Sequence, residues 1–224
     1  MKNFFKNNAL VLGIYLIIVS VAVYFLLQYG KVSVHIYMNQ IVGNKFLDLF
    51  FYYITYLGDG IIMPFLLLAI LFYNIRTGIY TTVSFFTATI ITNILKHQFY
   101  DDVMRPWHVF QWTVKAPLNY VNTEDLHIHN SFPSGHATQA FAIFMCLVFA
   151  TNNPLYKFLF FAIALLAAFS RVYLSQHWLV DITAGSLIGT ICGMAYYYSF
   201  LGKNAFHKLD KSLLKFRQAD QPKK

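Results

Sequence analysis

The chain has 224 residues, of which 58% are hydrophobic, 19% are aromatic and only 12% are charged, and its mean hydropathy is +0.50. Soluble domains carry about 25% charged residues, so this composition argues against a soluble protein and indicates one embedded in lipid. The net charge is +8, but the basic residues do not form one stripe, which argues against nucleic acid as a partner.

The first apolar stretch runs from Ala9 to Leu27 and follows Lys2 and Lys6. A signal peptide would begin in the same way, but this stretch is long and stays apolar beyond Ala22, so we expect an uncleaved span. The next segment, Gly30 to Asp48, mixes polar and apolar residues and is predicted to lie at the membrane interface.

Five further apolar stretches follow. We predict that they span the membrane over Phe51 or Leu57 to Asn74, Gly78 to Leu95, Gly135 to Thr151, Lys157 to Ser175 and Asp181 to Leu201. The first of these is interrupted at Gly58-Asp59-Gly60, where we expect a turn or a helix break. Cys146 and Cys192 lie deep in apolar stretches and are predicted to be buried thiols.

The predicted organisation is therefore all-α: a polytopic membrane protein with six transmembrane helices. We divide it into a first helix with its interfacial segment (residues 1–56), a core (57–201) and a basic cytoplasmic tail (202–224). The longest polar segment, 97–133, separates the third and fourth spans. Six spans place both termini on one side, and more Lys and Arg fall on that side than opposite. We expect a bacterial inner (cytoplasmic) membrane, with cytoplasmic termini and the opposite end facing the periplasm or the exterior.

Charged residues and histidines gather at the ends of the spans on that opposite side. The residues are Lys96 at the end of the third span, Ser134, Gly135 and His136 at the start of the fourth, Arg171 near the end of the fifth, and His177 and Asp181 at the start of the sixth. A charged side chain at the end of a membrane span costs free energy and is usually kept for a function, so the convergence of these residues predicts a functional site.

The residue types suit a phosphate group, which needs several fixed donors. Arg105 and Arg171 offer planar forks that bind phosphate in a bidentate way, and Lys96 supplies a compact charge. Ser134 adds a hydroxyl, and Gly135 opens a helix whose free N–H groups attract anions. We therefore predict these five residues as phosphate-binding.

Two histidines and one carboxylate supply the chemistry. His177 and Asp181 are four residues apart, hence on one helix face, and a carboxylate on one imidazole nitrogen leaves the other free to act. We predict that His177 is the nucleophile that forms a phosphohistidine and that Asp181 orients it. His136 is the candidate general acid, which protonates the leaving oxygen and later activates water.

A metal site is the alternative use of the remaining histidines. His127-Ile128-His129 could join His136 or Asp125, but no His-Glu-x-x-His pattern or cysteine pair accompanies them. We predict neither a metal nor another cofactor.

At these residues the sequence resembles the type 2 phosphatidic acid phosphatase (PAP2) family, which is similar in its core to vanadium haloperoxidases. The motif Pro-Ser-Gly-His is present at residues 133–136, and Ser-Arg-x5-His-x3-Asp matches in full from Ser170 to Asp181. The family's Lys-x6-Arg-Pro motif is met with a longer spacing, because eight residues separate Lys96 from Arg105-Pro106. We expect a small bulge after the third span to absorb the excess.

The resemblance implies a membrane phosphatase with a helical core, a histidine nucleophile and no metal. The predicted partners are the bilayer and a lipid phosphate at the outer leaflet: undecaprenyl diphosphate, phosphatidylglycerophosphate, phosphatidic acid or lipid A. A phosphotransferase, a transporter and a haloperoxidase are the alternatives, and the sequence predicts no oligomeric state. The aromatic residues of segment 97–133 serve as interfacial anchors or as part of a lid; they are Trp107, Phe110, Trp112 and Phe132.

Overall fold

The computed structural model describes residues 2–114, 117–121, 127–202 and 204–213, and within them it contains helices and no strand. The helices are α1 Lys2–Asn39, α2 Lys45–Ile54, α3 Met63–Tyr73, α4 Ile75–Ile94, α5 Pro106–His108, α6 Gly135–Ala150, α7 Pro154–Tyr173 and α8 Leu179–Phe200. Shorter 3-10 or π turns are η1 Thr55–Gly58, η2 Leu95–Phe99, η3 Val109–Val114 and η4 Asn204–Leu209. The predicted all-α class is confirmed.

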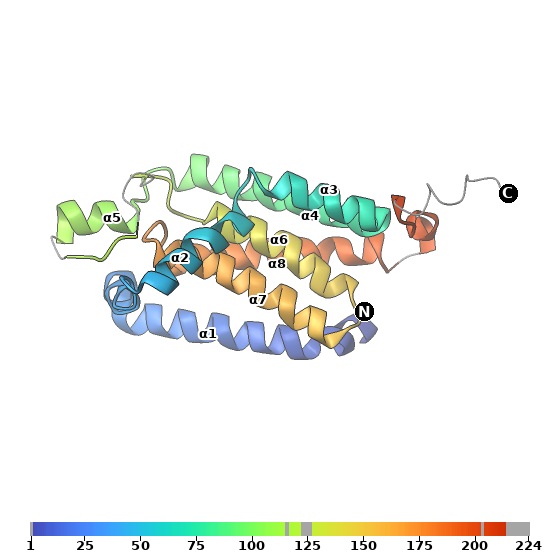
Figure 1. Cartoon of the computed structure of the whole chain (residues 1–224), viewed down its shortest axis with the longest axis horizontal. Helices are drawn as coiled ribbons and strands as arrows, with labels where there is room; N and C mark the ends of the chain where they lie inside the picture. The colour runs from blue at the N-terminus through green and yellow to red at the C-terminus, as the bar shows by residue number, and fades with distance from the viewer. Residues whose placement is uncertain (1, 115–116, 122–126, 203, 214–224) are drawn as a thin grey trace.

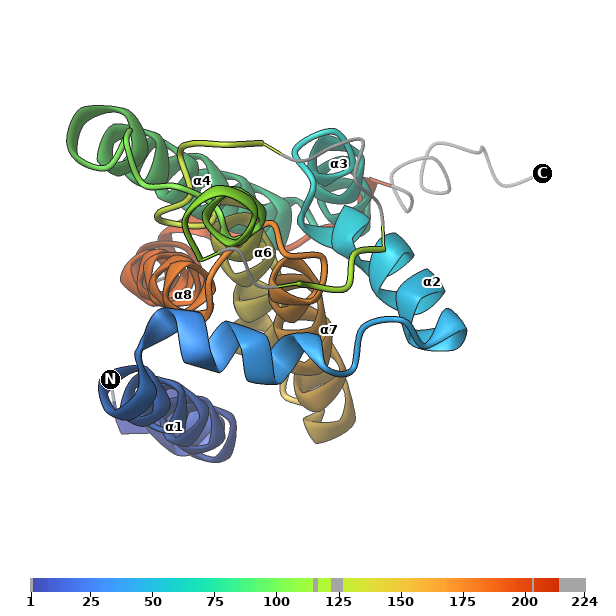
Figure 2. The same cartoon turned by 90° about the vertical axis from the view of Figure 1, so that its left-hand side faces the viewer.

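Helix α6 is the centre of the bundle and packs against α4, α7 and α8 (Figures 1 and 2). Its contact with α8 is so close that two positions on α8 require glycine. A Cβ on Gly185 would lie 2.6 Å from the Ser134 carbonyl oxygen, and one on Gly189 would lie 2.5 Å from the Thr138 carbonyl oxygen. Small residues allow such close backbone approach between apolar helices, and here they bring the starts of α6 and α8 together.

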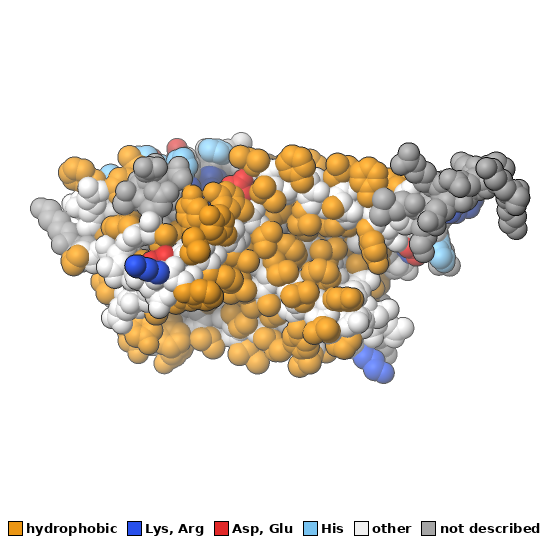
Figure 3. Space-filling model, viewed as in Figure 1, with side chains coloured by type: hydrophobic (Ala, Val, Ile, Leu, Met, Phe, Trp, Pro, Cys, Tyr) orange, Lys and Arg blue, Asp and Glu red, His pale blue; other side chains and the backbone are white. Residues whose placement is uncertain are grey.

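Several helices are long and apolar enough to cross a membrane. Four qualify singly, and α2–η1 with α3 makes a fifth if that bent pair, at 63°, is one span. Hydrophobic side chains cover the middle of the molecule in Figure 3, whereas charged side chains and histidines lie mostly towards its two ends. The protein is thus an integral membrane protein, as predicted.

The predicted count of six spans is not confirmed. Helix α6, which corresponds to the fourth predicted span, has 16 residues. Such a helix rises ~24 Å, which is less than the ~30 Å hydrocarbon thickness. Because other helices surround α6, it does not need the length of a lipid-facing span. The expected break after Gly58 is present, between η1 and α3.

Helix α1 extends beyond the predicted first span and kinks at Gly30, where φ is 72° and ψ is 160°. The part after the kink lies across one end of the bundle (Figure 2). It is held there by His35, whose Nε2 lies 3.1 Å from Ser175 Oγ, and by Lys31, whose Nζ lies 4.9 Å from the centre of the Trp178 ring. The predicted interfacial segment therefore covers the start of α8.

The ends of the bundle differ in content. Helix α1 begins and α8 ends at the right of Figure 1, whereas α4 and α7 end, and α6 and α8 begin, at the other end. The predicted site residues all fall at this second end.

Both cysteines are buried and free, as predicted for thiols in apolar stretches. The tail beyond residue 213, which we predicted as part of a cytoplasmic segment, lies outside the described residues.

Candidate active site

His177 and Asp181 form a buried pair at the start of α8. The His177 Nδ1 atom lies 3.3 Å from Asp181 Oδ2, and the two side chains are 2% and 1% exposed. The same oxygen accepts hydrogen bonds from the Trp178 backbone N–H (2.9 Å) and the Ser131 hydroxyl (2.5 Å). Because these donors hold the Asp181 carboxylate in place, it can orient the imidazole of His177, and Nε2 is then the nitrogen available for chemistry.

Burial lowers the pKa of His177 well below its usual range, and the positive charges of Arg105, Lys96 and Arg171 lower it further. The imidazole is therefore neutral near pH 7, which is the form that a nucleophile requires. All three cations are therefore near enough to His177 for their charges to act on its imidazole.

The start of α6 meets the start of α8. Ser134 is the N-cap of α6, where its Oγ accepts from the Ala137 N–H at 3.4 Å, and its own backbone N–H donates to the Asp181 carbonyl at 3.1 Å. The space next to Gly135 is open, because no heavy atom lies within 4 Å of the position that a Cβ would take there. A small anion can therefore approach the N–H groups of this helix end.

Arg105 is anchored from segment 127–130 and from the turn between α7 and α8. Its Nε donates to the His129 carbonyl at 3.1 Å, and its Nη1 donates to the carbonyl and the side-chain oxygen of Gln176 at 3.2 and 3.1 Å. Burial lowers the pKa of Arg105 to about 10, so it stays charged at pH 7. Arg171, in the last turn of α7, donates from Nη1 to Thr55 Oγ1 at 2.9 Å.

Lys96 lies in the π turn η2, where the Tyr100 N–H donates to the Leu95 carbonyl at 3.1 Å. This wide turn is the bulge that we expected after the third predicted span. It lies in the stretch before Arg105 that carries the extra residues, and the charge of Lys96 still acts on His177. The longer spacing therefore leaves Lys96 within the cluster.

His136 meets the carboxylate of Asp59, a residue that was predicted only as part of a turn or a helix break. Its Nε2 lies 3.6 Å from Asp59 Oδ2, and the two side chains are 26% and 27% exposed. The relevant sequence signal was a carboxylate between two glycines within an apolar stretch, since a charge at such a depth usually has a partner. Thr55 and Gln176 were not predicted as part of the site, and their contacts with Arg171 and Arg105 join distant segments.

The aromatic residues of segment 97–133 differ in their surroundings. Phe110 is 1% exposed and its ring centre lies 6.0 Å from that of Trp178, so it is a packing residue rather than an interfacial anchor. Trp112 is 63% exposed, as an anchor requires. Trp107 donates from Nε1 to the His127 carbonyl at 2.8 Å, and Phe132 packs edge-on against Tyr100.

In the described part of the chain, no group of three or more His, Cys, Asp or Glu side chains is arranged to hold a metal ion. His129 contributes its carbonyl oxygen to Arg105. Asp125, which belonged to the alternative metal set, lies outside the described residues.

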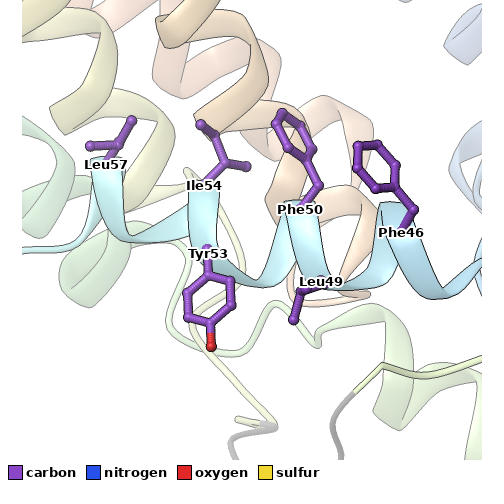
Figure 4. A pocket seen from close by; sticks show the side chains of 6 residues that line it. All are labelled: Phe46, Leu49, Phe50, Tyr53, Ile54 and Leu57. Atoms are coloured by element: carbon purple, nitrogen blue, oxygen red, sulfur yellow. The ribbon is translucent and has the colours of Figure 1, made fainter.

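An apolar groove with a volume of about 480 Å³ runs along α2 and η1 beside this end of the bundle (Figure 4). Its lining residues are Phe46, Leu49, Phe50, Tyr53, Ile54 and Leu57. The last lining residue, Leu57, precedes Gly58 and Asp59 in the chain, and Asp59 forms the pair with His136.

Comparison with known proteins identifies the family. The PAP2 superfamily profile matches residues 77–205, which is more than half of the chain. The chain is 28% identical over 169 residues to a lipid A 4'-phosphatase of Porphyromonas gingivalis, covering 71% of this chain and 69% of that protein. It is 31% identical over 71 residues to a lipid A 1-phosphatase of the same organism, a match that covers 31% of this chain and only 16% of that protein.

Two solved structures are similar. LpxE of Aquifex aeolicus superposes with a TM-score of 0.65 at 26% identity, covering 74% of this chain and 93% of that one. A PAP2-type phosphatidylglycerolphosphate phosphatase from Bacillus subtilis superposes with a TM-score of 0.64 at 22% identity, covering 90% and 99%. The second likeness concerns the fold alone.

Proposed function

The chain belongs to the PAP2 superfamily as a membrane lipid phosphatase, and we propose that it hydrolyses its substrate through a phosphohistidine on His177. The observation that carries this proposal is the buried contact of His177 Nδ1 with Asp181 Oδ2 at 3.3 Å, and burial together with the charges of three cations favours the neutral imidazole. A neutral imidazole with one oriented nitrogen is a nucleophile, and fixed cations stabilise the charge on a transferring phosphoryl group.

In the first step, Nε2 of His177 attacks phosphorus while the bond from phosphorus to the lipid oxygen breaks. His136 gives its proton to that leaving oxygen, and the lipid departs as an alcohol or a shorter phosphate. Lys96, Arg105 and Arg171, with Ser134 and the N–H of Gly135, bind the phosphoryl oxygens. Asp181 stabilises the positive charge that the His177 ring gains.

In the second step, water attacks phosphorus and the bond to Nε2 breaks. His136, now neutral, takes a proton from that water and regains its starting state. Inorganic phosphate leaves, and His177 is neutral again. No metal takes part in the proposed cycle.

We further propose that the substrate is a lipid phosphate whose hydrocarbon chains lie along the α2 groove, at the periplasmic face of a bacterial inner membrane. Lipid A phosphates come first among the candidates because the relatives from Porphyromonas gingivalis carry that activity in their names. Undecaprenyl diphosphate, phosphatidylglycerophosphate and phosphatidic acid remain in the panel to be tested.

The test uses the purified full chain in detergent with excess chelator. We expect the parent protein to release phosphate from at least one lipid and to form an acid-labile, base-stable phosphoenzyme. The His177→Ala variant loses both properties, whereas His207→Ala, a histidine in η4 at the opposite end, keeps them. Equal release by the parent and His177→Ala would refute the nucleophile. Phosphate that appears on a second lipid rather than in solution would establish the phosphotransferase alternative.

A further inference from the structure

Asp59 is a carboxylate for which the proposed reaction has not yet given a role. Its Oδ1 accepts from the Ile61 N–H at 2.8 Å, and its carbonyl oxygen accepts from the Ile62 and Met63 N–H groups at 3.1 Å. These bonds close the turn between η1 and α3. The second carboxylate oxygen, Oδ2, is left for His136 and lies 3.6 Å from its Nε2.

The break between η1 and α3 brings this carboxylate to the start of α6. The helices on the two sides of the break are bent by 63° to each other, and Asp59 lies in the break between them. Gly58 lies directly on His136, because a Cβ at that position would come within 2.8 Å of the His136 carbonyl oxygen. Only a residue without a side chain permits this approach, and the approach sets the distance between Asp59 and His136.

The charges around His136 explain why a carboxylate is useful there. Arg171 and Arg105 both act on this imidazole, and His177 lies near it. Burial first, and then these two cations, favour the neutral ring, yet a general acid must carry a proton when the substrate arrives. Asp59 supplies the opposing negative charge on the side of Nε2.

We propose that Asp59 is a positioning residue for His136: its carboxylate favours the imidazolium form and turns Nδ1 towards the leaving oxygen. This inference rests on the proposed phosphatase reaction. The bond from Nδ1 to its proton breaks as the O–H bond of the leaving group forms, while the Nε2 proton stays between the ring and Asp59. In the second step, Nδ1 regains a proton from the attacking water, so protons balance over the cycle.

The test removes the negative charge of Asp59 but keeps the hydrogen bond that closes the turn between η1 and α3. In Asp59→Asn, the amide oxygen can still accept from the Ile61 N–H, whereas the carboxylate at His136 is gone. The full chain in detergent is assayed on two phosphates with the same hydrocarbon chain, one with an alkyl and one with an aryl leaving group. The alkoxide needs a proton as it departs, whereas the aryl oxide is a good leaving group without one.

We expect Asp59→Asn to slow release from the alkyl phosphate by about 10²-fold and release from the aryl phosphate by less than about threefold. The alkaline limb of kcat/KM for the alkyl phosphate moves to lower pH, because Arg105 and Arg171 then face His136 without the opposing charge. Asp59→Glu restores part of the rate. Asp48→Asn is the matched control, since Asp48 also closes a turn, through the Gly43 N–H at 3.1 Å, but contacts Tyr173 rather than a histidine.

An equal loss on both substrates, or no loss on either, would overturn the role of Asp59. A double variant guards against a folding defect: in a His136→Ala background, Asp59→Asn should cost nothing further on the aryl phosphate. A further loss in that background would mean a structural role and would also overturn the inference. A parent protein that releases no phosphate from any substrate would refute the phosphatase proposal itself, and this inference with it.

Discussion

Replacing Asp181 by asparagine tests the central contact of the site with the least change of shape. Asp181 Oδ2 meets His177 Nδ1, the Trp178 N–H and the Ser131 hydroxyl, at 3.3, 2.9 and 2.5 Å. All three contacts use the same oxygen, so an asparagine that places its carbonyl oxygen there keeps them and loses only the charge. An asparagine that places its NH₂ group there can only donate, so the Trp178 bond is lost, Nδ1 of His177 must become the acceptor, and the proton moves to Nε2.

A proton on Nε2 blocks the nitrogen that attacks phosphorus. The variant also loses a charge-assisted hydrogen bond to the imidazolium, which is worth about 1.5–3 kcal/mol. The variant must also restore the reactive tautomer of His177, and we expect the two costs together to reduce transition-state stabilisation by about 3–5 kcal/mol. At about 1.4 kcal/mol per tenfold, kcat/KM falls by about 10²- to 10⁴-fold.

The assay is steady-state phosphate release combined with rapid-quench measurement of phosphoenzyme formation. Both rates should fall together, because the defect lies in nucleophilic attack. Elution and thermal unfolding in detergent show whether the variant is folded, and Asp48→Asn serves as a carboxylate control at the same end of the bundle. Phosphoenzyme formation within threefold of the parent rate would refute the orienting role of Asp181.

Three further predictions concern the phosphate site, the packing and the pH dependence. Lys96→Ala should lower kcat/KM about 10- to 100-fold through loss of one phosphate contact; a change within a few-fold would remove Lys96 from the site. Gly189→Ala places a Cβ 2.5 Å from the Thr138 carbonyl oxygen, so it should destabilise the bundle by about 1–3 kcal/mol, and an unchanged Tm would contradict the packing argument. Since the pKa of His177 lies well below its usual value, phosphoenzyme formation should persist as pH falls through about 6.5 and decline only at more acidic pH, when the buried ring is protonated. A rate that halves near pH 6.5 would show an ordinary histidine.

Much of the site was predictable because its residues sit in local patterns. His177 and Asp181 are four residues apart at a helix start, so helix geometry alone places them on one face. The motif from Ser170 to Asp181 and the helix start at Ser134 and Gly135 are equally local. Lys96 was the instructive exception, because its spacing departed from the family pattern and the π turn η2 lies in the stretch that carries the extra residues.

The contacts that hold the site were not predictable, because they join segments far apart in the chain. Thr55 meets Arg171, Gln176 meets Arg105, and Asp59 meets His136. Each contact depends on how helices pack and bend, and hydropathy patterns carry no information on the partner of a single polar residue. The count of six spans is not confirmed for a related reason: neighbouring helices surround α6, and hydropathy does not distinguish burial in protein from burial in lipid.

The sequence by itself determined the class of protein and predicted the chemistry that we propose for it. Its composition requires lipid around most helices, and its histidines, arginines and carboxylate stand at helix ends, where local periodicity orients them. The tertiary structure decided which end groups meet, how the first helix covers the site, and which carboxylate faces His136. These features depend on packing between distant segments, where glycines such as Gly58 and Gly189 set the distances, and packing is a property of the whole fold rather than of any stretch of sequence.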